Sequence, residues 1–200
     1  MHAVHRLSCA AFAVLLLTAC SGPTVVTTDD STVASAPPAA APAPTTRPSN
    51  AHLANAFDYA VRGGDTTRYA FITPSERWQC VIVPRVQAAC GKAGGTASAI
   101  GITGAPDEIP GTDGEASAPN TILVDRSADA RFAALPTQSD SGTGAPAVLP
   151  FNRILAVAGF RCNVQEATGI SCLSELSGKG FTFSADGFTM TYTDVPADAP

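Results

Sequence analysis

The sequence lacks features that several common classes of protein require. Its amino-terminal apolar run, residues 7–17, is uncharged but much shorter than the ~20 apolar residues that span a bilayer, so we do not expect a membrane helix there. Histidine is scarce: only His52 follows residue 20, and a Ser-His-Asp or Cys-His catalytic site would have to use it. Nothing near His52 resembles the strained turn that carries such a nucleophile, and we expect it to face solvent in the first turn of a short helix.

Basic residues are also few. The chain has 12 Lys and Arg against 17 Asp and Glu, a formal net charge of −5, and removal of a leader containing Arg6 would leave 11 − 17 = −6. An acidic chain without a basic stripe is poorly suited to nucleic acid or anionic lipid headgroups. We therefore expect no nucleic-acid partner.

What the amino terminus does contain is the order Leu17-Thr18-Ala19-Cys20 directly after the apolar run. This order is similar to the bacterial lipobox, in which the cysteine is acylated and becomes the first residue after cleavage. We expect residues 1–19 to be a lipoprotein signal peptide and Cys20 to carry the lipid, with ordinary secretory cleavage after Ala19 as the alternative. Acyl chains on Cys20 would anchor the protein to the extracytoplasmic side of the cell membrane.

A second compositional gap follows Cys20. Residues 21–50 contain no aromatic side chain and are rich in Ala, Pro and Thr. Such a segment cannot bury enough apolar area to offset the entropy of ordering, so residues 20–50 are expected to form a disordered tether. At ~3.1 Å per residue a proline-rich tether of this length reaches roughly 90 Å. A proline-motif ligand or a glycosylated stalk are the alternatives.

Residues 51–200 are expected to form a single domain that is mainly β (α+β), a small disulfide-braced antiparallel sheet with one short N-terminal helix. Apolar residues at helical spacing over 53–61 predict the helix, which would end at Gly63-Gly64. Hairpins are predicted to turn at 73–76 and at Asp186-Gly187. Between about 91 and 146 we expect long loops, with short strands at 121–124 and 100–102.

Four cysteines follow Cys20, and in an extracytoplasmic domain they predict two disulfides. Spacing favours the local pairs Cys80 with Cys90 and Cys162 with Cys172, because residues ten apart face each other across a hairpin with a three-residue loop. The loops would be 84–86 and 166–168, the second followed by a glycine that suits a left-handed conformation. Long-range pairing and a metal site are the alternatives, although zinc sites usually have closer cysteine spacing.

Candidate functional residues are few. Arg85 would lie near the tip of the first stapled loop, where a pre-organised side chain loses little entropy on binding a partner, or it is an ordinary surface arginine. Trp78 is expected to pack on a strand rather than to form a sugar or lipid platform. The acidic stretch 107–115 lacks the ligand pattern of calcium loops, and Gly91-Lys92 has the wrong order for a phosphate-binding loop. We predict no catalytic residue, no metal and no cofactor.

Two stretches resemble a group of small secreted or lipid-anchored actinobacterial envelope proteins. They are Phe71-Ile72-Thr73-Pro74-Ser75 with Trp78-Gln79-Cys80, and Gly169-Ile170-Ser171-Cys172 with Gly178-Lys179-Gly180-Phe181; Leu149-Pro150-Phe151-Asn152 is similar to the segment that precedes the second cysteine pair there. The resemblance implies an envelope location and a disulfide-braced β domain, and it carries over no activity. Glu76-Arg77 departs from the Gly-Asn often found in that turn.

These observations favour a lipid-anchored, noncatalytic module that binds an unknown protein, glycan or lipid of the cell envelope. The alternatives are an envelope hydrolase using carboxylates or serine, and a carrier of lipids or small molecules, which would need an apolar pocket lined by a sheet.

Overall fold

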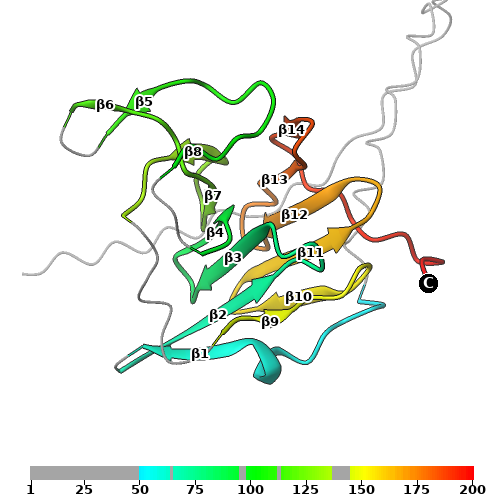
Figure 1. Ribbon diagram of the computed structural model, residues 1–200. Coiled ribbons are helices and arrows are strands. Elements are labelled where there is room, and N and C mark those ends of the chain that lie inside the picture. The colour runs from blue at the N-terminus through cyan, green and yellow to red at the C-terminus, as the bar shows by residue number, and fades with distance from the viewer. Residues whose placement is uncertain (1–49, 64, 95–97, 112–113, 137–144) are drawn as a thin grey trace, which may run out of the picture. The chain divides into compact units, whose positions relative to one another are not determined.

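The computed structural model describes residues 50–63, 65–94, 98–111, 114–136 and 145–200 (Figure 1). The predicted signal peptide, Cys20 and the tether up to residue 49 lie outside these ranges and stay predictions. In the described part of the chain, no helix combines the length and the apolar character needed to cross a membrane.

The described residues form two mainly antiparallel sheets and a small ribbon. The first sheet runs in the order β1 (Ala60–Gly63), β2 (Thr66–Ile72), β3 (Trp78–Val83), β4 (Gln87–Lys92), β7 (Thr121–Asp125) and β8 (Arg131–Ala133), with β9 (Ala147–Val148) parallel to β2. The second runs β10 (Ile154–Val157), β11 (Phe160–Gln165), β12 (Gly169–Ser174), β13 (Gly180–Phe183) and β14 (Phe188–Thr189). The ribbon pairs β5 (Ile109–Pro110) with β6 (Ala116–Ser117).

The same five-strand meander occurs twice. Strands β2-β3-β4-β7-β8 follow one another across the first sheet as β10-β11-β12-β13-β14 do across the second. In both meanders the second and third strands have six residues each and are joined by three, and a cysteine is the third residue of one strand and the fourth of the other. The chain therefore contains two hairpins of identical length and register.

The two sheets pack face to face and enclose one core (Figure 1). Alternation along each strand puts large apolar side chains inward, as expected for sheets buried on one face. The core side chains with at most 1% exposure include Phe71, Ile82, Ile122, Leu155, Phe160, Ile170, Phe181 and Phe183. Trp78 packs edge-on against Phe183 with ring centroids 5.1 Å apart, so the predicted role of Trp78 in strand packing is confirmed.

The outer face of the second sheet is polar and is covered by the end of the chain. The Asn163 amide, which is fully buried, donates to the Tyr192 hydroxyl and to the Thr193 carbonyl, both at 3.0 Å. The Ser171 hydroxyl accepts from the Thr193 backbone N–H at 2.8 Å. Residues 192–195 thus supply hydrogen bonds to the polar side chains that they cover, in place of the water that they exclude.

The prediction of a mainly β, antiparallel fold with two disulfides is confirmed, whereas the predicted helix over 53–61 is not. That segment holds a four-residue 3-10 helix, η1 (Ala56–Tyr59), and then β1. Asn55 caps η1 by accepting from the Phe57 N–H, but the chain is already extended at Ala60 because β1 pairs with β2. Tertiary pairing therefore overrides the apolar spacing.

The two strands expected in the loop-rich region have different outcomes. Residues 121–124 form β7, as predicted. Residues 100–102 are not a strand, because Gly101 has a φ of 71°, which breaks an extended run.

Candidate functional site

The four cysteines form the two local disulfides. The Cys80–Cys90 S–S distance is 2.07 Å and the Cys162–Cys172 distance is 2.09 Å. Each bridge joins residues that face each other in register across a hairpin. The predicted pairing is thus confirmed.

Both hairpins turn at the three residues predicted, but their left-handed positions differ. In the second hairpin, Gly169 follows the loop with a φ of 89°. In the first, Arg85 in the middle of the loop has a φ of 59°, with Pro84 before it and the Val86 N–H donating to the Val83 carbonyl at 3.0 Å. This order matches a type II turn, whose third position usually holds glycine.

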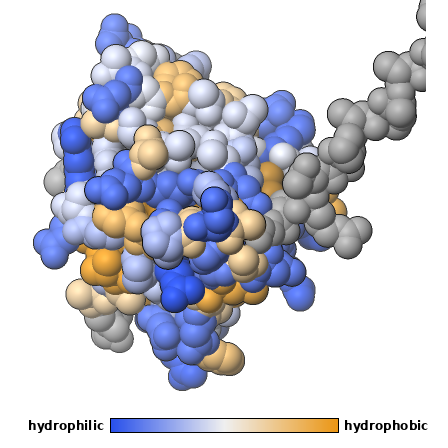
Figure 2. Space-filling view, turned by 90° about the vertical axis from the view of Figure 1, so that its right-hand side faces the viewer, coloured by the Kyte–Doolittle hydropathy of each residue, from blue (hydrophilic) through white to orange (hydrophobic). Residues whose placement is uncertain are grey.

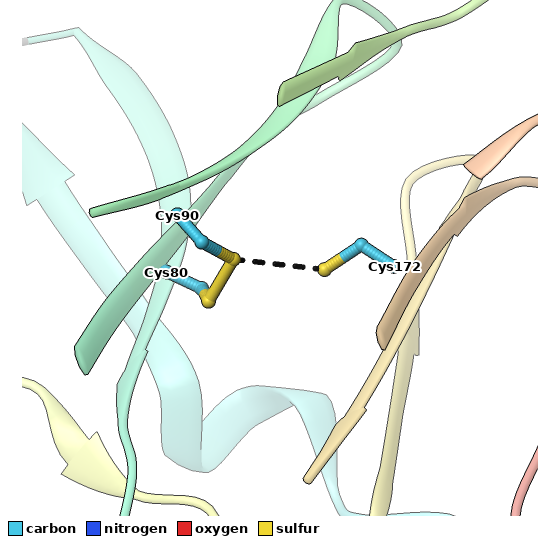
Figure 3. A group of neighbouring side chains, drawn as sticks. All are labelled: Cys80, Cys90 and Cys172. Atoms are coloured by element: carbon cyan, nitrogen blue, oxygen red, sulfur yellow. Dashed lines mark hydrogen bonds between the residues drawn. A yellow bond between two sulfur atoms is a disulfide. The ribbon is translucent and has the colours of Figure 1, made fainter. Parts of the chain in front are cut away.

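The disulfides meet in the centre of the core. Sγ of Cys90 on β4 lies 3.8 Å from Sγ of Cys172 on β12, across the space between the sheets (Figure 3). Neither sulfur carries a hydrogen, so this is a van der Waals contact between two disulfides. Among the described His, Cys, Asp and Glu side chains, Cys80, Cys90 and Cys172 are the group whose ligand atoms are close enough to share a metal ion, all within 4.8 Å. As disulfides they have no thiolate to offer one.

A surface hollow lies where the tip of the first hairpin meets the second sheet. It has a volume of about 400 Å³ and is lined by Arg85, Arg126, Ala158, Gly159, Phe160, Glu175 and Leu176. These residues come from the β3–β4 loop, the β7–β8 loop, the β10–β11 turn, the first residue of β11 and the start of the β12–β13 loop. We call this set the Arg85 pocket. Its volume falls within the range of small-ligand sites, ~300–1,000 Å³.

Backbone hydrogen bonds tie the walls of the Arg85 pocket together. The Arg85 N–H donates to the Ala158 carbonyl, and the Glu175 N–H to the Gly159 carbonyl, both at 3.0 Å. The Arg126 N–H donates to the Val86 carbonyl at 3.0 Å. The pocket rim is therefore held by main-chain hydrogen bonds, one of them between the two sheets and two within a sheet.

The charges in the Arg85 pocket are unbalanced. Arg85 and Arg126 are exposed, and neither guanidinium has a hydrogen bond or ion pair to another described residue. The Glu175 carboxylate already accepts from Nε of Arg161 at 3.3 Å. Two arginines whose guanidiniums have no partner among the described residues thus line the same hollow as a carboxylate that is already engaged, which favours an anionic group from outside.

Apolar surface also borders this site. Val86 and Leu176 are 53% and 63% exposed. Figure 2 shows that, on the face it presents, polar residues predominate and apolar ones are scattered between them. A hollow with a charged lining and an apolar edge is a common composition for a protein contact.

The other residues considered from sequence do not gather into a chemical site. His52 lies in a turn before η1, not in a helix, with Nε2 3.4 Å from the Ala197 carbonyl. Gly91 has a packing role, since a Cβ there would lie 2.7 Å from the Asn120 carbonyl oxygen. Asp107 and Glu108 are exposed, and Asp113 lies outside the described residues.

Sequence reasoning singled out Arg85 but missed Arg126, Glu175 and Leu176. These residues follow the ends of β7 and β12, some 40 to 90 positions after Arg85 in the chain. No local pattern marks them, because the pocket depends on how the two sheets dock.

Comparison with known proteins gives no further guide. No family model, curated protein or solved structure matches the chain.

Proposed function

We propose that this protein is a lipid-anchored module on the outer side of the cell membrane that binds an acidic group of an envelope partner in the Arg85 pocket. The observation that carries the proposal is the pair of unpaired guanidiniums, Arg85 and Arg126, held around one hollow in an otherwise acidic chain. Arginine suits such a role because its planar guanidinium binds carboxylate or phosphate through two hydrogen bonds.

The rigid frame supports binding rather than catalysis. The main-chain bonds that hold Arg85 and Arg126 mean that little backbone entropy is lost when a partner docks. The sole carboxylate in the pocket lining, Glu175, is ion-paired with Arg161, so it is not placed as a general base. A hydrolase or a carrier remains the alternative for the test to distinguish.

The anchor belongs to the same proposal and rests on the sequence. Leu17-Thr18-Ala19-Cys20 and the aromatic-free segment after it support an acylated Cys20 and a tether that lets the domain reach partners at a distance from the bilayer.

The test is affinity capture of the full-length acylated protein from its own envelope after mild cross-linking. Truncation of a hot-spot arginine at the centre of an interface costs ~2 kcal/mol or more, so Arg85→Ala and Arg126→Ala should each weaken binding of a specific protein by about thirty-fold or more. Arg62→Ala, which removes an exposed arginine on β1, is the matched control and should capture the partner as the wild type does.

Equal capture by all three variants would reject the pocket as the contact. A co-purifying lipid or glycan with no protein partner would instead favour the carrier or the enzyme.

A further inference from the structure

We propose that Cys90 and Cys172 form an alternative disulfide that joins the two sheets, reached by thiol–disulfide exchange between the two native bridges. The proposal rests on the 3.8 Å contact between their Sγ atoms (Figure 3). Both residues are at most 1% exposed, and they come from corresponding positions of the two hairpins, the fourth residue of β4 and of β12.

The geometry favours the Cys90 and Cys172 sulfurs, which make the 3.8 Å contact, over Cys80, whose Sγ lies within 4.8 Å of Cys172. A disulfide requires an S–S distance of ~2.05 Å, so the two Sγ atoms would have to approach by less than about 2 Å, a movement shared by two side chains. The Sγ atoms of Cys80, Cys90 and Cys172 all lie within 4.8 Å of one another, and Sγ of Cys162, the native partner of Cys172, is not part of this group. Cys172 is therefore the sulfur of the second bridge that a thiolate of the first can reach.

The chemistry needs an external dithiol as reductant. The dithiol transfers two electrons to the Cys80–Cys90 bridge and becomes a disulfide itself, leaving thiols at Cys80 and Cys90. The Cys90 thiolate then attacks Sγ of Cys172 in line with the existing bridge; the Cys90–Cys172 bond forms, the Cys162–Cys172 bond breaks, and Cys162 leaves as a thiolate that takes up a proton. This second step moves a disulfide without net oxidation or reduction.

The exchange changes what the covalent bond constrains. Each native bridge joins residues ten apart within one sheet, whereas Cys90 and Cys172 are 82 apart and lie in different sheets. The isomer would fasten the two meanders to each other and leave Cys80 and Cys162 as thiols. A dithiol that reduces one native bridge would thus yield a protein whose two sheets are joined by a disulfide, instead of a protein that has only lost a cross-link.

The test compares two single substitutions. In Cys80→Ser the unpaired thiol is Cys90, whose Sγ lies 3.8 Å from that of Cys172. In the matched control Cys90→Ser it is Cys80, whose Sγ lies within 4.8 Å of Cys172 but does not make the 3.8 Å contact. After acid quench and alkylation in denaturant, trypsin with a glutamate-specific protease places each cysteine in its own peptide: 78–85, 86–92, 162–166 and 167–175. Linked peptides then report the pairing by mass.

In Cys80→Ser we expect a 86–92/167–175 linked pair and alkylated Cys162, with about ten-fold more Cys162 labelling than in Cys90→Ser. Label confined to Cys90, or equal exchange in both variants, would overturn the proposal. The same peptide analysis of wild-type protein treated with limiting dithiothreitol is a second test, and it does not require that a substituted protein folds. There the same linked pair should appear once the first bridge is reduced, and its absence in partly reduced protein would also overturn the proposal.

Discussion

Arg85 occupies a backbone conformation that glycine would hold at lower cost. Its φ of 59° places it in the left-handed region, which costs an L-residue with a Cβ roughly 1–2 kcal/mol. We expect Arg85→Gly to be more stable than Arg85→Ala by about 1 kcal/mol, because both lose the side chain but only glycine relieves the strain.

Equilibrium unfolding in urea measures this difference. Equal midpoints for the glycine and alanine variants would show that the loop relaxes without cost, while loss of partner capture in both would tie the strained position to binding.

Among the described glycines with a positive φ, Gly169 is the position where an added methyl group comes closest to a neighbouring atom. A Cβ there would lie 2.2 Å from the Phe183 carbonyl oxygen of β13, and φ is 89°. Gly169→Ala should therefore lower the free energy of unfolding by roughly 1–2 kcal/mol for the left-handed backbone, and by a further amount for displacing the neighbouring strand. Gly178→Ala is the control, since Gly178 has a φ of 70° and no atom within 4 Å of the added Cβ.

Thermal or urea unfolding of both variants separates the two costs. If Gly169→Ala is no less stable than Gly178→Ala, the close approach of β13 does not limit this position.

At the scale of elements, the carboxyl-terminal segment 192–195 makes the free energy of unfolding fall as pH rises into the alkaline range. Burial of the Tyr192 hydroxyl, followed by the charge of Asp194, raises its pKa well above 10.0. The neutral phenol is therefore favoured in the folded state, so this contribution is fully present below about pH 10 and is lost as pH rises further toward the folded pKa.

Tyr192→Phe tests this dependence. The variant loses the hydroxyl's hydrogen bonds to Asn163 and Asp194 and should be about 1 kcal/mol less stable at neutral pH. From roughly pH 9 to 11 its free energy of unfolding should fall less steeply than that of the wild type. Parallel alkaline titrations monitored by circular dichroism, with Tyr69→Phe as control, would contradict this if the slopes of Tyr192→Phe and wild type coincide.

The elements that sequence predicted well are those that local chemistry determines. The spacing of ten in each cysteine pair is enough to predict both hairpins with their three-residue loops, since register follows from the loop length. The helix predicted over 53–61 is not confirmed, because apolar spacing in a short segment does not distinguish a helix from an edge strand that finds a partner.

The candidate site was predictable in one residue only. Arg85 is marked by its place at a stapled tip, but Arg126 and Glu175 reach the pocket through long-range docking of the sheets. The contact between Cys90 and Cys172 has the same origin, because nothing in either hairpin specifies that the two face each other.

For the whole molecule, the acyl anchor is the strongest prediction from sequence. Cys20→Ala removes the acylation site, so the protein should leave the detergent phase of a detergent-partitioning experiment almost completely, since one acyl chain already contributes ~0.8 kcal/mol per buried methylene. A Cys9→Ala variant is the control and should stay with the membrane fraction. Continued partitioning of Cys20→Ala into detergent would contradict the lipoprotein prediction.

The repeated meander has a kinetic consequence. In each meander, every strand pairs with the strands before and after it in the order given above. Each native disulfide closes a loop between residues only ten apart. Loops this short bring their ends together at a lower entropic cost than the loops needed for inter-sheet contacts, so the local pairs are the ones that meet most often while the two halves are still separate. We therefore expect the native local pairs to predominate in a newly synthesised chain whose sheets have not yet docked, before Cys90 and Cys172 come within reach of each other.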